Sequence, residues 1–139
     1  MGKIEKQEAR ISAILATKNL AVSKAKLKTY LRYLKGHLEF PVKVKGIEDF
    51  EWEEYYVFGP GSEREYEQLK KTNPSYTDTY NLLGLVEEVD DWEGILAKLV
   101  RLSDKKRFTL PLADLRATDK SSKNYKLLDD YSVWFVNNR

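Results

Sequence analysis

The C-terminal segment constrains the fold most strongly, because five large apolar side chains recur there at helical spacing. They are Leu127, Leu128, Tyr131, Trp134 and Phe135. Positions i, i+1, i+4, i+7 and i+8 share one face of a helix, here of about fourteen residues. Residues 108–112, which come shortly before, are typical of a short strand. We expect this helix to cover the core of a domain that also contains a sheet.

Two further helices are expected near the N-terminus. Ile11, Ile14 and Leu15 recur at helical spacing among charged residues, which indicates a short amphipathic helix. Ser23 is a suitable N-cap for a second helix, and Pro41 ends it. The second helix is apolar on one face and rich in lysine and arginine on the other. Its apolar face consists of Leu27, Tyr30, Leu31, Leu34 and Leu38.

One domain is expected to account for most of the chain. A chain of 139 residues can bury about two-thirds of the surface that its unfolded form exposes, which is enough for a single core. The first helix offers few apolar side chains to such a core. We therefore expect residues 1–22 to form an N-terminal helical extension and residues 23–139 to form a single α+β domain.

Five segments predict strands, because they combine period-two alternation with β-branched and aromatic residues. They are residues 40–45, 52–58, 79–89, 95–102 and 108–112. Between the second and third of them, Ser62 and Glu65 form a capping-box pattern that indicates a short polar helix. Short strands with tight turns favour a small, partly open barrel whose edges the helices cover. The predicted fold class is α+β, with a small SH3-like antiparallel β-barrel of about five strands, N-terminal helices and a C-terminal helix.

The residue types present exclude several kinds of site. The chain has no cysteine, which excludes disulfides, thiolate zinc sites and cysteine nucleophiles. We expect His37, the one histidine, to interact with carbonyls at a helix end instead of acting as a base. No catalytic or nucleotide-binding signature is present, so we expect no enzymatic activity. No apolar run approaches the roughly 20 residues that cross a bilayer, so we expect a soluble, cytoplasmic protein without a membrane partner.

The net charge of +2 conceals a separation of charge along the chain. Residues 48–93 carry fourteen acidic and three basic side chains, whereas residues 1–39 carry nine basic and three acidic ones. The acidic middle is therefore a candidate for cation binding. The basic helices could contact a polyanion, but we favour the alternative, in which they neutralise the acidic middle within the chain.

The loop 87–93 is the strongest candidate metal site. It supplies five carboxylates within seven residues, namely Glu87, Glu88, Asp90, Asp91 and Glu93. Ca²⁺ takes six to eight oxygen ligands in flexible geometry, so a hairpin loop with several carboxylates suits it. No EF-hand pattern is present. The alternative is a solvated acidic loop that holds no metal.

A second acidic cluster alternates with aromatic residues around the predicted strand 52–58. Its carboxylates belong to Glu48, Asp49, Glu51, Glu53 and Glu54. At the edge of a strand we expect these side chains to face water or the lysine-rich helix. A second, weaker metal site is the alternative.

Four segments within residues 30–139 carry a family resemblance. They are Tyr33-Leu34 to Leu38-Glu39-Phe40-Pro41-Val42, Leu83-Gly84-Leu85, Leu110-Pro111-Leu112-Ala113-Asp114-Leu115, and Asp129-Asp130-Tyr131 to Trp134. In these segments the chain resembles the small cyanobacterial calcium-binding proteins of CcbP type. The resemblance implies a small α+β, barrel-like fold and calcium binding through surface carboxylates. The near-neutral charge and residues 62–77, which look like an insertion, set this chain apart from that family.

The sequence therefore predicts a non-enzymatic protein that binds or buffers Ca²⁺ through surface carboxylates. The alternative is an interaction module that binds a protein or a nucleic acid through its basic N-terminal helices. A protein partner is compatible with both interpretations. We do not expect a nucleic-acid partner, because no RNP-type aromatic motif is present.

Overall fold

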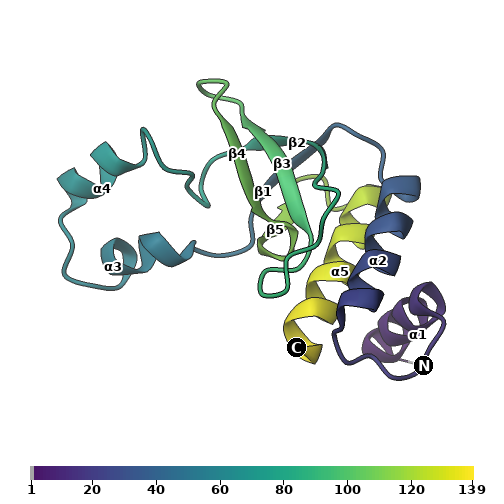
Figure 1. Cartoon of the computed structure of the whole chain (residues 1–139). Helices are drawn as coiled ribbons and strands as arrows, with labels where there is room; N and C mark the ends of the chain where they lie inside the picture. The colour runs from purple at the N-terminus through teal and green to yellow at the C-terminus, as the bar shows by residue number, and fades with distance from the viewer. Residues whose placement is uncertain (1) are drawn as a thin grey trace.

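A computed structural model describes residues 2–139, which form helices around one antiparallel sheet (Figure 1). The helical elements are α1 (Lys3–Leu15), α2 (Lys24–His37), η1 (Glu51–Glu53), α3 (Glu54–Val57), α4 (Glu63–Leu69), η2 (Leu112–Asp114) and α5 (Lys123–Asn138). The strands are β1 (Val42–Gly46), β2 (Tyr80–Leu85), β3 (Leu96–Arg101), β4 (Arg107–Pro111) and β5 (Leu115–Ala117). The predicted α+β class is confirmed.

The five strands form one open sheet in the order β4-β3-β2-β1-β5. All neighbours are antiparallel, and β1 lies between β2 and the last strand, β5. A bulge between Leu82 and Gly84 shifts the register of β2 against β3. Within residues 2–139, β4 and β5 do not pair with each other, so the sheet does not close and the SH3-like barrel is not confirmed.

The predicted strand 52–58 is wrong, because this segment forms η1 and α3. The buried carboxylate of Glu53 explains the helical turn. It accepts hydrogen bonds from Tyr66 Oη (2.5 Å), Ser75 Oγ (2.7 Å) and the backbone N–H of Tyr76 (2.8 Å). A buried carboxylate needs such partners, and a turn of helix points Glu53 toward them. The fifth strand is instead β5, directly after η2, in a segment outside the predicted strands.

The helix α5 covers one face of the sheet and lies beside α2 (Figure 1). Tyr131, Trp134 and Phe135 are buried, as the spacing predicts. The ring of Trp134 stacks on Tyr30 of α2 with 5.1 Å between centroids. Burial of each large apolar side chain contributes about 1.5–3 kcal/mol to folding. This aromatic contact therefore fixes the two helices against the same core.

The first helix, α1, packs against α2 and α5. Its Ile11 and Leu15 are buried, and Arg10 makes two hydrogen bonds of 2.9 Å to the buried carboxylate of Asp130. The predicted boundary after residue 22 stays a prediction, but α1 contributes to the common core. In residues 2–139, no helix combines the length and the apolar character that crossing a membrane requires.

Candidate metal-binding cleft

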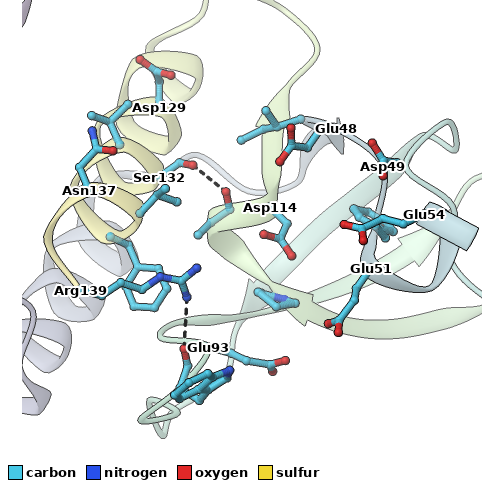
Figure 2. Close-up of a pocket in the computed structure, with 18 residues that line it drawn as sticks. Glu48, Asp49, Glu51, Glu54, Glu93, Asp114, Asp129, Ser132, Asn137 and Arg139 are labelled. Atoms are coloured by element: carbon cyan, nitrogen blue, oxygen red, sulfur yellow. Dashed lines mark hydrogen bonds between the residues drawn. The ribbon is translucent and has the colours of Figure 1, made fainter. Parts of the chain in front are cut away.

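A cleft of about 580 Å³ opens between the segment that contains η1 and α3, the turn η2, the loop before β3 and the last turns of α5 (Figure 2). Seven of its lining residues carry a carboxylate, and one, Arg139, carries a positive charge. The carboxylates belong to Glu48, Asp49, Glu51, Glu54, Glu93, Asp114 and Asp129. Because so little positive charge offsets them, the cleft is a region of strongly negative potential.

The helical conformation of η1 and α3 places part of the second acidic cluster in the cleft. Glu51 and Glu54 are three residues apart, which puts them on the same side of a helical turn. Glu48 and Asp49 precede η1 and also line the cleft, whereas Glu53 points into the core. The alternation that suggested a strand edge is therefore the pattern of a short helix with one buried carboxylate.

Asp114 occupies the centre of the cleft, on the turn η2. Its backbone carbonyl accepts a hydrogen bond of 2.9 Å from Ile47, which holds this turn against the segment after β1. The carboxylate is open to solvent within the cleft, yet the surrounding protein displaces much of its water. This desolvation raises the pKa of Asp114, and the nearby charges of Glu93, Glu48 and Glu51 raise it further, whereas Arg139 opposes the rise.

A tight turn places Glu93 in the same cleft. Asp90 Oδ1 accepts hydrogen bonds from the backbone N–H groups of Trp92 (2.8 Å) and Glu93 (2.7 Å), which lowers the pKa of Asp90. Gly94 closes the turn with φ of 75°, a conformation that glycine adopts without strain. Figure 2 shows the carboxylates of Glu93, Asp114 and Glu51 around the same space.

The structure separates the other predicted ligands of the loop 87–93 from this cleft. Glu87 forms an ion pair with Lys35 of α2, which lowers the pKa of Glu87. The carboxylate of Asp90 is engaged with the backbone of its own turn. Glu88 and Asp91 are exposed and do not line the cleft. Of the five carboxylates, only Glu93 joins the acidic residues from other parts of the chain.

Arg139 is the positive charge of the cleft. Its Nη1 donates a long hydrogen bond of 3.5 Å to the carbonyl of Trp92, and its guanidinium lies 4.9 Å from the ring centroid of Phe135 (Figure 2). The guanidinium thus stands close to the loop that carries Glu93. It acts as an internal counter-ion to the acidic residues around it.

The carboxylates of the cleft are near one another without forming a compact ligand cage. Among residues 2–139, no group of three or more Asp, Glu or His side chains is arranged closely enough to hold one metal ion as it stands. A divalent cation would therefore require side chains to turn toward it. The exposed, unbranched side chains of Glu48, Glu51 and Glu93 can do so, because their rotamers are free to change.

Sequence reasoning missed Asp114, Asp129 and Arg139. Asp114 lies in one of the segments that carry the family resemblance, directly before β5. A carboxylate within such a segment was the feature of the sequence that could have pointed to Asp114. The contributions of Asp129 and Arg139 depend on how α5 packs, which no local pattern reveals.

The basic residues of α2 lie away from the cleft. Lys24, Lys28 and Arg32 are exposed, whereas Lys35 pairs with Glu87. His37 Nδ1 lies 2.7 Å from the carbonyl oxygen of Tyr33 in the last turn of α2, which confirms its predicted place at a helix end.

The fold is similar to that of two solved structures. The crystal structure of Anabaena CcbP matches with a TM-score of 0.59 and 19% identity, over 97% of this chain and 93% of that one. A calcium-binding protein in its calcium-binding form matches with a TM-score of 0.60 and 19% identity, over 98% and 96% of the two chains. No family model and no curated protein matches the sequence. The resemblance to CcbP-type proteins is thus confirmed as a similarity of fold.

Proposed function

We propose that the protein binds Ca²⁺ in the acidic cleft. Asp114 and Glu93 are the central ligands, and Glu48 and Glu51 turn toward the ion to complete the site with water. The observation that carries this proposal is the environment of Asp114, whose neighbours include three other carboxylates. A divalent cation placed there would relieve their mutual repulsion. The similarity of fold to a structure described as a calcium-binding protein in its calcium-binding form supports the same proposal.

Ca²⁺ suits the cleft better than Mg²⁺. Ca²⁺ accepts six to eight oxygen ligands at variable angles, so exposed glutamates and water can complete its shell. Mg²⁺ requires near-ideal octahedral geometry and gives up its water reluctantly. The lining residues supply ligands and charge, so we propose a binding or buffering role without a chemical reaction.

Thermal unfolding with and without metal tests the proposal. A ligand that binds only the folded state at about 100 times its Kd adds roughly 2.7 kcal/mol of stability, which is visible in a melt of a domain this size. Asp114→Asn should remove most of the rise in Tm that Ca²⁺ produces. The matched control is the double variant Glu88→Gln with Asp91→Asn, which removes two exposed charges of the loop outside the cleft and should retain the rise.

The same experiment distinguishes the cleft from the loop 87–93. If the loop itself binds the metal, as the sequence predicts, the loop variant should lose the rise in Tm and Asp114→Asn should keep it. An equal rise with Ca²⁺ and Mg²⁺, or no rise at millimolar Ca²⁺, would contradict a calcium site in either place.

A further inference from the structure

The face of the sheet that points away from α5 is basic. Successive residues of a strand point to opposite faces, and Val42, Val44, Leu82 and Leu99 are buried on the helix side. The residues between them point outward. Five of the outward residues, from four strands, are basic, and they are Lys43, Lys45, Lys98, Arg107 and Arg116.

The strand register brings these cations together across the sheet. Lys45 of β1 is directly opposite Arg116 of β5. A second row runs from Lys43 through Asn81 and Val100 to Arg107. Neighbouring strands are about 4.8 Å apart, so the cations spread over a band about 19 Å wide across the five strands.

Among the described residues, no carboxylate forms an ion pair with the cations of this face. The strands β1 to β5 contain no acidic residue. Within residues 2–139, none of the five cations forms an ion pair, although Lys98 is close enough to lower the pKa of Glu87. Arg101, which points to the helix side, differs because it is paired with Asp78 and Asp104. The outward cations are therefore free to bind an external anion.

Although the sequence alone predicts no nucleic-acid partner, the strand register gathers these cations on one face. We propose that this basic sheet face binds the phosphate backbone of single-stranded nucleic acid without reading its sequence. Lysine and arginine side chains bind phosphate through charge and hydrogen bonds, and Asn81 and Thr109 add polar contacts. None of the outward-facing residues of these strands is aromatic, so bases would not stack on the face. Binding through the backbone alone is independent of sequence.

The shape of the face favours a nucleic-acid strand over a lipid bilayer. A groove of about 300 Å³ runs beside Leu83, Lys98, Arg107 and Thr109, and a groove accommodates a chain better than a flat membrane. Membrane-bound surfaces insert several large apolar side chains, whereas the groove on this face exposes Leu83, and the more exposed Trp92 lies at the acidic cleft.

Fluorescence anisotropy with a labelled oligothymidylate tests the proposal on the full chain. Binding to the wild type should weaken as salt increases, with a slope of log K against log salt of about −3.5 if five phosphates are contacted. The triple variant Lys43→Gln, Lys98→Gln and Arg107→Gln should make this slope less steep by about 2. The matched control removes the same charge from α2 by Lys24→Gln, Lys28→Gln and Arg32→Gln, and it should keep the wild-type slope. All six side chains are exposed, so both variants should fold, which a thermal melt checks.

Several outcomes would overturn the proposal. They are no binding of the wild type at low salt, an equal loss of binding in both triple variants, or full binding by the sheet variant. Binding to vesicles that contain phosphatidylserine, without binding to the oligonucleotide, would show that the face binds a membrane surface and not nucleic acid. Salt-sensitive self-association without oligonucleotide binding, measured by sedimentation, would show that the face meets the acidic cleft of a second copy.

Discussion

The backbone N–H of Ile95 donates a hydrogen bond of 2.9 Å to Tyr131 Oη in the buried core. Through this bond, α5 holds the turn that positions Glu93 at the acidic cleft. Gly94, which lies between Glu93 and Ile95 in the chain, adopts φ of 75° and lies against α5. A Cβ atom at residue 94 would lie 2.6 Å from Tyr131 Oη and 2.7 Å from the ring of Phe135. The acidic cleft therefore depends on close packing between this turn and the helix.

Gly94→Ala should destabilise the protein by about 1–3 kcal/mol, because the added methyl group both overpacks the core and strains the backbone. A thermal melt should show Tm lowered by several degrees. Gly36→Ala is the matched control, because Gly36 lies in α2 and a Cβ there meets nothing within 4 Å. Alanine should stabilise that helix by up to about 1 kcal/mol. Equal effects of the two substitutions would contradict the packing described for Gly94.

The pH dependence of stability should report the environment of Asp114. Its pKa is raised, so between its ordinary value of about 3.9 and its value in the folded protein the folded state binds more protons than the unfolded state. Ionisation of Asp114 therefore lowers the free energy of unfolding as pH rises through that window. Asp114→Asn should reduce the loss in the metal-free protein, as measured by urea unfolding from pH 3 to pH 7.

Asp119 provides the opposite case for this pH series. Its carboxylate accepts hydrogen bonds from Ser121 Oγ (2.7 Å) and from the Ser121 backbone N–H (3.0 Å), which lower its pKa. Such a group stabilises the fold above its unfolded pKa and loses that effect as pH falls through its folded pKa. Asp119→Asn should therefore lower stability at neutral pH. The account of Asp114 would be wrong if both variants changed the pH profile in the same direction.

Removal of the internal counter-ion should strengthen calcium binding. Arg139 opposes the rise in the pKa of Asp114 and stands in the same cleft, so its charge competes with a bound cation. Arg139→Gln should lower the Kd for Ca²⁺ by roughly two- to fivefold, the effect expected from one partly screened charge. The matched control is Arg32→Gln on the exposed face of α2. Unchanged or weaker binding by Arg139→Gln would show that the guanidinium does not compete with the metal.

The ion pair between Arg10 and Asp130 should make α1 part of the cooperative unit. Asp130 is buried, and Gln7 also donates a hydrogen bond of 2.9 Å to it. Arg10→Gln leaves this carboxylate with fewer partners, which should cost about 1–3 kcal/mol in the free energy of unfolding. The exposed Lys6→Gln on the same helix should cost less than about 0.5 kcal/mol. Similar costs in urea unfolding would support a separable extension of residues 1–22.

The elements that depend on local patterns could be predicted from the sequence. The apolar face of α5 and the Ser23 cap of α2 follow from spacing and residue type alone. Ser23 Oγ accepts a hydrogen bond of 3.2 Å from the backbone N–H of Lys26, as expected of an N-cap. Such features involve residues close in the chain, so their physics is visible in the sequence.

The elements that depend on distant partners could not be predicted. The conformation of residues 51–57 follows the burial of Glu53, and one of its partners, Ser75, is 22 residues away in the chain. Asp114 lines the same cleft as Glu48 because the turn η2 lies against the segment after β1. The five carboxylates of the loop 87–93 are adjacent in sequence, but the turn and Lys35 direct them to different surroundings. Proximity in the chain therefore does not show which of these carboxylates share a cleft in the folded protein.

Calorimetric titration with Ca²⁺ tests the central claim most directly. The wild type and the loop variant Glu88→Gln with Asp91→Asn should bind Ca²⁺ with the same affinity. The cleft variant Asp114→Asn with Glu93→Gln, which removes the same charge, should bind at least about tenfold more weakly, a difference of about 1.4 kcal/mol. The claim would be contradicted if the wild type bound no Ca²⁺, if it bound Mg²⁺ equally well, or if the cleft variant kept the wild-type affinity.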